Sequence, residues 1–145
     1  MPRWVREAFA DYSARLGTSL KLSLVEIEPG ARGAGRSPGQ AIAAEAQKLS
    51  SILRKEDYIV ALDEHGTELT TRGLSQWLAA RMQDGRDLAF LIGGPDGLAD
   101  ELLTRADFKW ALSRLTFPHA LVRVVLAEQL YRAQSVLTHH PYHRD

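Results

Sequence analysis

The sequence predicts an α/β fold in which a mostly parallel sheet is flanked by helices. Two short apolar runs, residues 58–62 and 88–92, do not alternate between polar and apolar side chains. Such runs are typical of strands that are covered on both faces. Each run follows a segment in which apolar residues recur at helical spacing. Helices that alternate with buried strands indicate a parallel sheet.

Length and composition indicate one soluble domain. The chain has 145 residues, of which 45% are hydrophobic and 25% charged, the usual profile of a domain with its own core. We therefore expect a single domain over residues 1–145. The 18 basic and 18 acidic residues cancel, so a nucleic acid would have to be bound by a local basic patch.

The composition also restricts the compartment and the chemistry. Because the chain has no cysteine, disulfides, thiolate metal sites and cysteine nucleophiles are excluded. No apolar run approaches the roughly 20 residues that span a bilayer, and the start lacks the apolar block of a signal peptide. We expect a cytoplasmic protein with no membrane partner.

The first element is a helix that ends at Gly17. Its apolar stripe consists of Trp4, Val5, Ala8, Phe9, Tyr12 and Leu16. Alternating apolar residues over 20–27 then predict a strand. The glycine-rich residues 29–39 predict a mobile loop, whose Arg32 and Arg36 are able to contact phosphate.

The middle of the chain repeats a helix and strand pattern. A helix over 42–53 precedes the strand 58–62, which ends at Asp63, and a helix from Leu74 to Met82 precedes the strand 88–92, which breaks at Gly93. A further short helix begins near Leu98. A compact apolar segment over 110–117 follows it.

The last helix, about residues 118–137, is apolar nearly all round. Pro118 suits its first turn, and Glu128 and Arg132 mark the part left for solvent. A helix with so little polar surface must be buried on more than one side. In a chain this small the second side predicts contact with another copy, and hence a homodimer.

The segment Gly93 to Gly97, with the sequence Gly-Gly-Pro-Asp-Gly, has two interpretations. It follows a buried strand, where ligands bind in open α/β sheets, yet the same residues suit a plain tight turn. No lysine and hydroxyl follow the glycines as in a Walker loop, and the glycines at 30, 33 and 35 do not match the dinucleotide fingerprint. Both the turn and the ligand site stay open.

Four of the five histidines lie in residues 119–145, where most chains fray. They are His119, His139, His140 and His143. Pro141 interrupts the helical geometry that would align them, so we expect no metal site. Ser113 and His119 lack a nucleophile elbow and an orienting acid, which argues against a hydrolase.

Taken together, these segments resemble one known family. The resemblance rests on Leu-Ile-Gly-Gly-Pro-Asp-Gly-Leu at 91–98, Leu-Ser-Arg-Leu-Thr-Phe-Pro-His at 112–119, the helix that follows, and His-His-Pro-Tyr-His-Arg at 139–144. The chain is similar to the RlmH family of ribosomal RNA large subunit methyltransferases, which belong to the SPOUT class. The resemblance implies a deep trefoil knot near the carboxyl end and a homodimer. It also implies transfer of a methyl group from S-adenosyl-L-methionine to N3 of a pseudouridine in 23S ribosomal RNA.

The resemblance also implies the site residues. The S-adenosylmethionine contacts correspond to Leu62, Gly93, Leu112, Ser113, Arg114, Leu115, Thr116 and Phe117. His119 is then positioned to accept the imide proton, Arg144 to stabilise oxyanion charge or hold phosphate, and Tyr142 to stack on the base. In the family, the tail of one subunit approaches the cofactor site of the other.

Several expectations accompany this interpretation. For RNA capture we expect a patch of Arg32, Arg36, Arg114, Arg144 and the histidines, suited to the large subunit or the 70S ribosome. The short strand that opens family members before the helix has no counterpart in this sequence. If that absence is genuine, we expect the sheet to lack one strand; the alternative is that the natural protein is longer. Two alternatives stay open: a SPOUT methyltransferase for a different RNA, and a non-catalytic dimeric ribosome-binding module.

Overall fold

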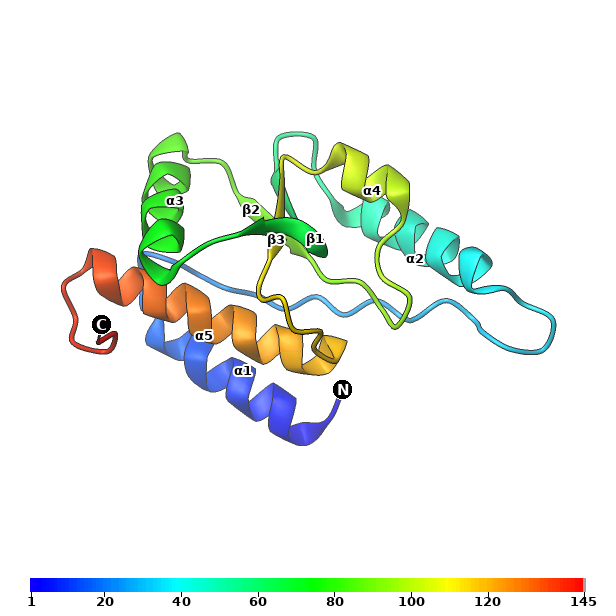
Figure 1. Cartoon of the computed structure of the whole chain (residues 1–145), viewed down its shortest axis with the longest axis horizontal. Coiled ribbons are helices and arrows are strands. Elements are labelled where there is room, and N and C mark those ends of the chain that lie inside the picture. Colours follow the sequence, from blue (N-terminus) through cyan, green and yellow to red (C-terminus); the bar gives the residue numbers. More distant parts are fainter. Residues whose placement is uncertain (145) are drawn as a thin grey trace. The chain divides into compact units, whose positions relative to one another are not determined.

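The computed structural model describes residues 1–144, which form five helices and three strands (Figure 1). In chain order they are α1 Arg3–Arg15, α2 Pro38–Ile52, β1 Tyr58–Glu68, α3 Thr71–Asp84, β2 Leu88–Leu91, α4 Asp100–Arg105, β3 Phe108–Ala111 and α5 His119–Leu137. The elements gather in two compact units. We call them the helical unit, with α1, α3 and α5, and the sheet unit, with α2, α4 and the strands. The expectation of one domain stays a prediction.

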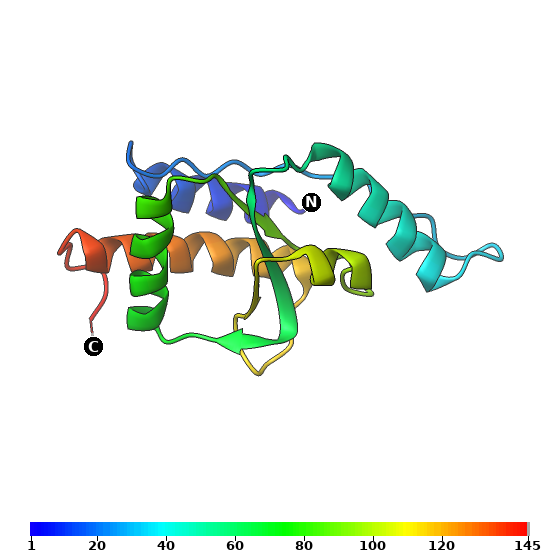
Figure 2. The same ribbon diagram turned by 90° about the horizontal axis from the view of Figure 1, so that it is seen from above.

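In the helical unit, α5 contacts both α1 and α3, and the two ribbon views show α1 alongside α5 (Figures 1 and 2). The buried face of α5 carries Leu126, Ala127, Leu130 and Ala133. Two buried polar side chains fix the helices at defined positions. Gln134 Nε2 donates to the Leu16 carbonyl at 2.8 Å, and Ser75 Oγ donates to the Ala133 carbonyl at 2.8 Å. The predicted last helix is confirmed.

The sheet unit has the strand order β2-β1-β3. β1 and β2 are parallel, with a register that runs from Tyr58 opposite Leu88 to Ala61 opposite Leu91. Residues 59–61, near the start of β1, are buried, as their unalternating sequence predicted. α2 contacts α4, and residues from both helices pack with the strands in one cluster. Its buried members are Ala46, Ile59, Leu91 and Leu102. The predicted parallel α/β arrangement is confirmed for this pair of strands.

Local sequence signals explain where two helices begin or end. At the start of α2, Ser37 and Gln40 form a reciprocal capping box, which satisfies free backbone N–H groups of the first turn. α3 begins after Thr70, whose hydroxyl accepts from the Gly73 N–H, and ends at Gly85 with a φ of 78°. That left-handed conformation suits glycine, which has no Cβ to clash.

The expectation of one strand is wrong, and another strand was not predicted. Residues 20–27 form no strand, although the side chains from Leu20 to Leu24 do alternate between half-buried and exposed. Alternation describes a face, whereas a strand also needs a neighbour for its backbone hydrogen bonds. Conversely, the apolar segment that begins at Trp110 includes the end of β3, a strand of four residues. So short a run carries too little pattern to be recognised as a strand.

Candidate functional site

The point where the pairing of β1 with β2 stops brings two of the predicted cofactor residues together. Ala61 and Leu91 are the last residues of the paired register. Leu62 is the next residue of β1, and Gly93 comes two residues after Leu91. Both residues are half-buried. Open α/β folds bind ligands beside the carboxyl ends of parallel strands. Here β2 ends beside Leu62, but β1 itself continues to Glu68, so the expectation that this strand ends at Asp63 is wrong.

The loop after β2 is a tight turn closed by glycine. The Gly97 N–H donates to the Gly94 carbonyl at 3.1 Å, and Gly97 has a φ of 85°. A Cβ on Gly93 would lie 2.5 Å from the Gly97 carbonyl carbon. The glycine at 93 is therefore required by the turn itself. The turn interpretation is confirmed, and backbone groups of the same loop remain able to bind a ligand.

The other predicted cofactor residues follow β3. Leu112 and Ser113 are half-buried and Arg114 is exposed, and all three belong to the sheet unit. Leu115, Thr116 and Phe117 begin the last segment of the helical unit. Leu115 is 72% exposed. An apolar ligand or a partner surface would cover it favourably.

His119 is the first residue of α5. Pro118 precedes it with a φ of −57°, and the Val122 N–H donates to the Pro118 carbonyl at 3.0 Å, so the first turn of the helix is well formed. The His119 side chain is exposed. The structure therefore offers an accessible imidazole at this position, as a proton acceptor requires.

The carboxyl-terminal tail, as far as Arg144, folds back on α5. His139 has a φ of 59°, which reverses the chain after the helix, and the His140 N–H donates to the Ser135 carbonyl at 2.8 Å. The rings of Tyr131 and Tyr142 then lie 4.5 Å apart between centroids. The unusual composition of the tail thus has a structural consequence, because its aromatic residue is docked on the helix.

A carboxylate and a guanidinium of α5 hold Tyr142. Its hydroxyl donates to Glu128 Oε1 at 3.0 Å, and the Arg132 guanidinium lies 4.8 Å from its ring centroid. Burial, together with hydrogen bonds to Tyr12 and Glu128, raises the pKa of Tyr142 well above its ordinary value near 10. The hydroxyl therefore stays protonated at neutral pH and acts as a donor.

The expectation that Glu128 and Arg132 face solvent is wrong. Their side chains are 16% and 27% exposed, and Arg132 donates to Glu128 Oε1 from Nε at 2.9 Å and from Nη2 at 2.6 Å. Arg132 Nη1 also lies 3.1 Å from Nδ1 of His143. The spacing of four residues predicted the ion pair but not the tail that covers it.

The arginines expected to bind RNA differ in their surroundings. Arg36, Arg114 and Arg144 are exposed. Arg32 is instead bound between two carboxylates, with Nη1 2.9 Å from Glu45 Oε2 and Nε 2.8 Å from Asp96 Oδ2. A guanidinium that is already neutralised by two acids is a poor phosphate ligand. The structure thus argues against a role for Arg32 in binding RNA. The same ion pairs also hold the loop over residues 29–39, which the sequence predicted to be mobile, at Arg32.

Other features do not contribute to the candidate site. Within residues 1–144, no three His, Asp or Glu side chains lie close enough to hold a metal ion. No helix in the same range is long and apolar enough to cross a membrane. A surface hollow of about 340 Å³ in the sheet unit is lined by none of the predicted site residues. Its lining consists of residues 65–67 and 106–109.

Comparison with known proteins decides the family. The family model described as "Predicted SPOUT methyltransferase" matches residues 1–143. The chain belongs to the SPOUT methyltransferase family. It is therefore a methyltransferase, as the resemblance of its motifs predicted.

Curated relatives support membership of the SPOUT family over nearly the whole chain. A protein of Stenotrophomonas maltophilia (strain R551-3), named ribosomal RNA large subunit methyltransferase H, is 51% identical over 143 residues. A protein of the same name from Burkholderia ambifaria (strain MC40-6) is 51% identical over 144 residues. Each alignment covers 99% of this chain and 92% of the relative. These relatives thus match nearly the full length of the chain.

Proposed function

We propose that the protein methylates N3 of a pseudouridine in 23S ribosomal RNA, within the large subunit or the 70S ribosome. The observation that carries this proposal is the 51% identity, over 99% of the chain, to relatives named ribosomal RNA large subunit methyltransferase H. The neutral net charge favours a structured ribosomal surface over free RNA, because only a local patch is available to attract phosphate.

The methyl donor is S-adenosyl-L-methionine, held in the sheet unit by Leu62, Gly93 and residues 112–114, with residues 115–117 following in the same chain segment. When bound, it supplies an electrophilic methyl group on a sulfonium. The residues present fit such a ligand. Leu62 and Leu112 leave apolar surface partly exposed beside β1, and Leu115 is largely exposed. Apolar walls with backbone donors and acceptors suit the adenine ring.

Attack by N3 requires that the imide lose its proton or that its carbonyls accept charge. The exposed imidazole of His119 takes the proton, since a histidine is able to accept one near neutral pH. The exposed guanidinium of Arg144 stabilises the charge that develops on the base oxygen. Tyr142 does not take the proton, because its hydroxyl is a donor to Glu128. Its role is to position the tail.

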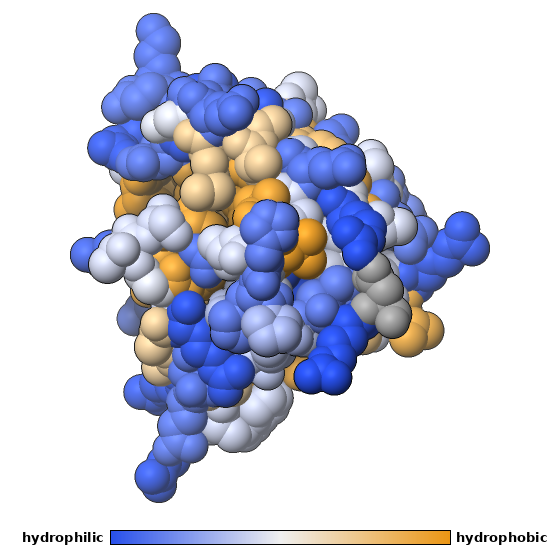
Figure 3. Space-filling model, turned by 90° about the vertical axis from the view of Figure 1, so that its left-hand side faces the viewer, coloured by the Kyte–Doolittle hydropathy of each residue, from blue (hydrophilic) through white to orange (hydrophobic). Residues whose placement is uncertain are grey.

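The active form is a homodimer in which α5 lies at the interface. Leu121, Val122, Val124 and Val125 are only half-buried in the single chain, and apolar surface gains free energy when it leaves water. Figure 3, which is viewed from the side where α5 ends, also shows apolar side chains at the surface among polar ones. The trefoil knot implied by the family belongs to the same proposal.

The test is a methylation assay on ribosomes that lack the modification. Purified protein and labelled S-adenosylmethionine are incubated with 70S ribosomes, with isolated large subunits or with extracted RNA, and the product nucleoside is identified by mass spectrometry. We expect methyl transfer to one pseudouridine in the assembled particles. Label on another RNA would favour a SPOUT methyltransferase with a different substrate. Donor binding without transfer to any RNA would contradict the proposed activity.

A further inference from the structure

We propose that Arg32, Glu45 and Asp96, here called the Glu45 cluster, are positioning residues that hold the loop from Gly93 to Gly97 in the conformation that binds the methyl donor. The inference rests on the proposed donor site at Gly93. It concerns the sheet unit alone, to which all of these residues belong.

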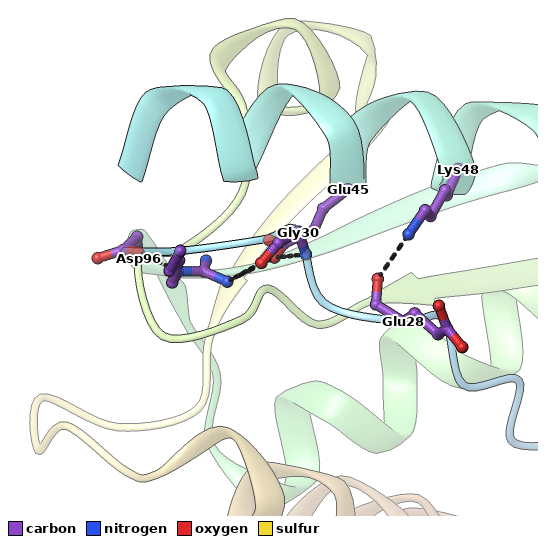
Figure 4. A network of polar contacts seen from close by, with 6 residues as sticks. Glu28, Gly30, Glu45, Lys48 and Asp96 are labelled. Carbon is purple, nitrogen blue, oxygen red and sulfur yellow. Dashed lines mark hydrogen bonds and ion pairs between the residues drawn. The ribbon is translucent and has the colours of Figure 1, made fainter. Parts of the chain in front are cut away.

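The cluster is built around a buried carboxylate of α2. Glu45 is only 7% exposed. Its Oε2 accepts from the Gly30 N–H at 2.8 Å and from Arg32 Nη1 at 2.9 Å (Figure 4). A charge is rarely removed from water unless it is both paired and hydrogen-bonded. Glu45 meets both conditions, which marks it as a built feature of the fold.

Arg32 connects that carboxylate to the candidate donor loop. Its Nη1 donates to the Gly30 carbonyl at 3.1 Å, and its Nε donates to Asp96 Oδ2 at 2.8 Å. Asp96 lies at the tip of the turn between Gly93 and Gly97. The Arg32 guanidinium therefore connects three segments that are far apart in the sequence. They are α2, the loop that contains Gly30, and the loop that follows β2. The hydrogen bonds to Asp96 and Glu45 raise the pKa of Arg32, so its charge is permanent.

The loop also lies directly against the Glu45 carboxylate. A Cβ on Gly94 would lie 3.3 Å from Glu45 Oε1 and 3.6 Å from Oε2. It would also lie 3.7 Å from Arg32 Nη2, a buried nitrogen with no hydrogen-bond partner. The backbone that follows Gly93 is thus held at two points. The Glu45 carboxylate lies against Gly94, and Arg32 forms an ion pair with Asp96.

Donor affinity depends on this contact because a preorganised loop pays less conformational entropy on binding. Loss of the Asp96 carboxylate leaves the turn intact, since its closing hydrogen bond joins Gly94 and Gly97. It releases only the attachment of the turn to Arg32. The expected consequence is weaker binding of the donor with an unchanged rate once the donor is bound.

Calorimetry with S-adenosylmethionine on the full chain tests the inference. The variants are Asp96→Ala, Asp96→Asn and Glu45→Gln. The control is Arg54→Ala, which removes an arginine that pairs with Asp57 and Asp87 in the same unit. We expect Asp96→Ala to raise the donor Kd by about fivefold or more, a change of the size usual for one lost contact. Asp96→Asn should restore part of the affinity, and Arg54→Ala should stay within about twofold.

Steady-state kinetics separate positioning from a general loss of structure. In Asp96→Ala the KM for the donor should rise while kcat at saturating donor stays within about twofold of the unsubstituted protein. If the unsubstituted protein does not bind the donor, the proposed function fails. If it binds and Asp96→Ala behaves like Arg54→Ala, the inference fails. A fall in kcat at constant KM also overturns it. If Glu45→Gln does not fold, the two Asp96 variants still test whether the cluster positions the donor loop.

Discussion

The hydroxyl of Tyr142 donates a 3.0 Å hydrogen bond to Oε1 of Glu128, and this contact docks the carboxyl-terminal tail on α5. Arg132 strengthens this docking, because its guanidinium binds Glu128 and also lies over the Tyr142 ring. The tail is thus held by a charged network of α5, which places Arg144 two residues beyond a fixed anchor.

The first prediction concerns the alkaline titration of Tyr142. Its pKa is raised in the fold, so the network stabilises the neutral hydroxyl. The contribution of this network to the unfolding free energy is fully present below pH 10 and is lost as the pH rises through the raised pKa of Tyr142. The difference in tyrosinate absorbance between the unsubstituted protein and Tyr142→Phe should have its midpoint above pH 10. The difference in unfolding free energy between the two should be constant from pH 7 to 9 and shrink above 10. A midpoint at the ordinary value would show that the tail is undocked in solution.

The second prediction concerns the turn after β2. Gly93→Ala places a Cβ 2.5 Å from backbone, and we expect a loss of about 1–3 kcal/mol in unfolding free energy, as for other steric conflicts. Gly39→Ala is the control. Its Cβ meets only Ser37 Oγ at 3.8 Å, and alanine in a helix is neutral or mildly stabilising. Denaturant titrations of both variants give the comparison. Equal stability of the two variants would exclude the tight turn.

The third prediction concerns α5 as an interface. Val124→Asp places a charge on its half-buried apolar surface, so we expect a monomer by sedimentation and a loss of methyl transfer. Ala10→Asp adds the same charge at an exposed position of α1 and should remain dimeric and active. A monomeric Val124→Asp variant with the normal rate would show that the dimer is not needed.

The fourth prediction concerns His119. Removal of a proton acceptor costs about 10²- to 10⁴-fold in rate, so His119→Ala should lower kcat by that order while the donor Kd is unchanged. His65→Ala is the matched control, because its side chain is 83% exposed and lies in the sheet unit outside the candidate site. A His119→Ala variant with normal kcat would assign the proton transfer to another group.

Long periodic segments made much of the fold predictable. α1, α3 and α5, the buried strand β2 and the first five residues of β1 all follow from the spacing of apolar residues, whereas the extension of β1 to Glu68 does not. The wrong strand over 20–27 and the missed β3 have one cause. Whether a short extended segment joins a sheet depends on which neighbour it meets, and that neighbour is distant in the sequence.

The candidate site was predictable by resemblance, but its supporting residues were not. Glu45 carried a usable signal, because it lies three residues after Ile42 on the apolar face of α2. Arg32 and Asp96 carried none, since their contact joins residues 64 positions apart. The docking of Tyr142 on Glu128 was likewise hidden, because an i to i+4 ion pair usually indicates a solvated face.

The most direct test of the account is mass spectrometry of 23S ribosomal RNA from large subunits or 70S ribosomes treated with the purified protein and S-adenosylmethionine. We expect one 3-methylpseudouridine, formed by the unsubstituted protein and by an Arg105→Ala control but strongly reduced with Arg144→Ala. Absence of that nucleoside, with the dimer intact and the donor bound, would contradict it.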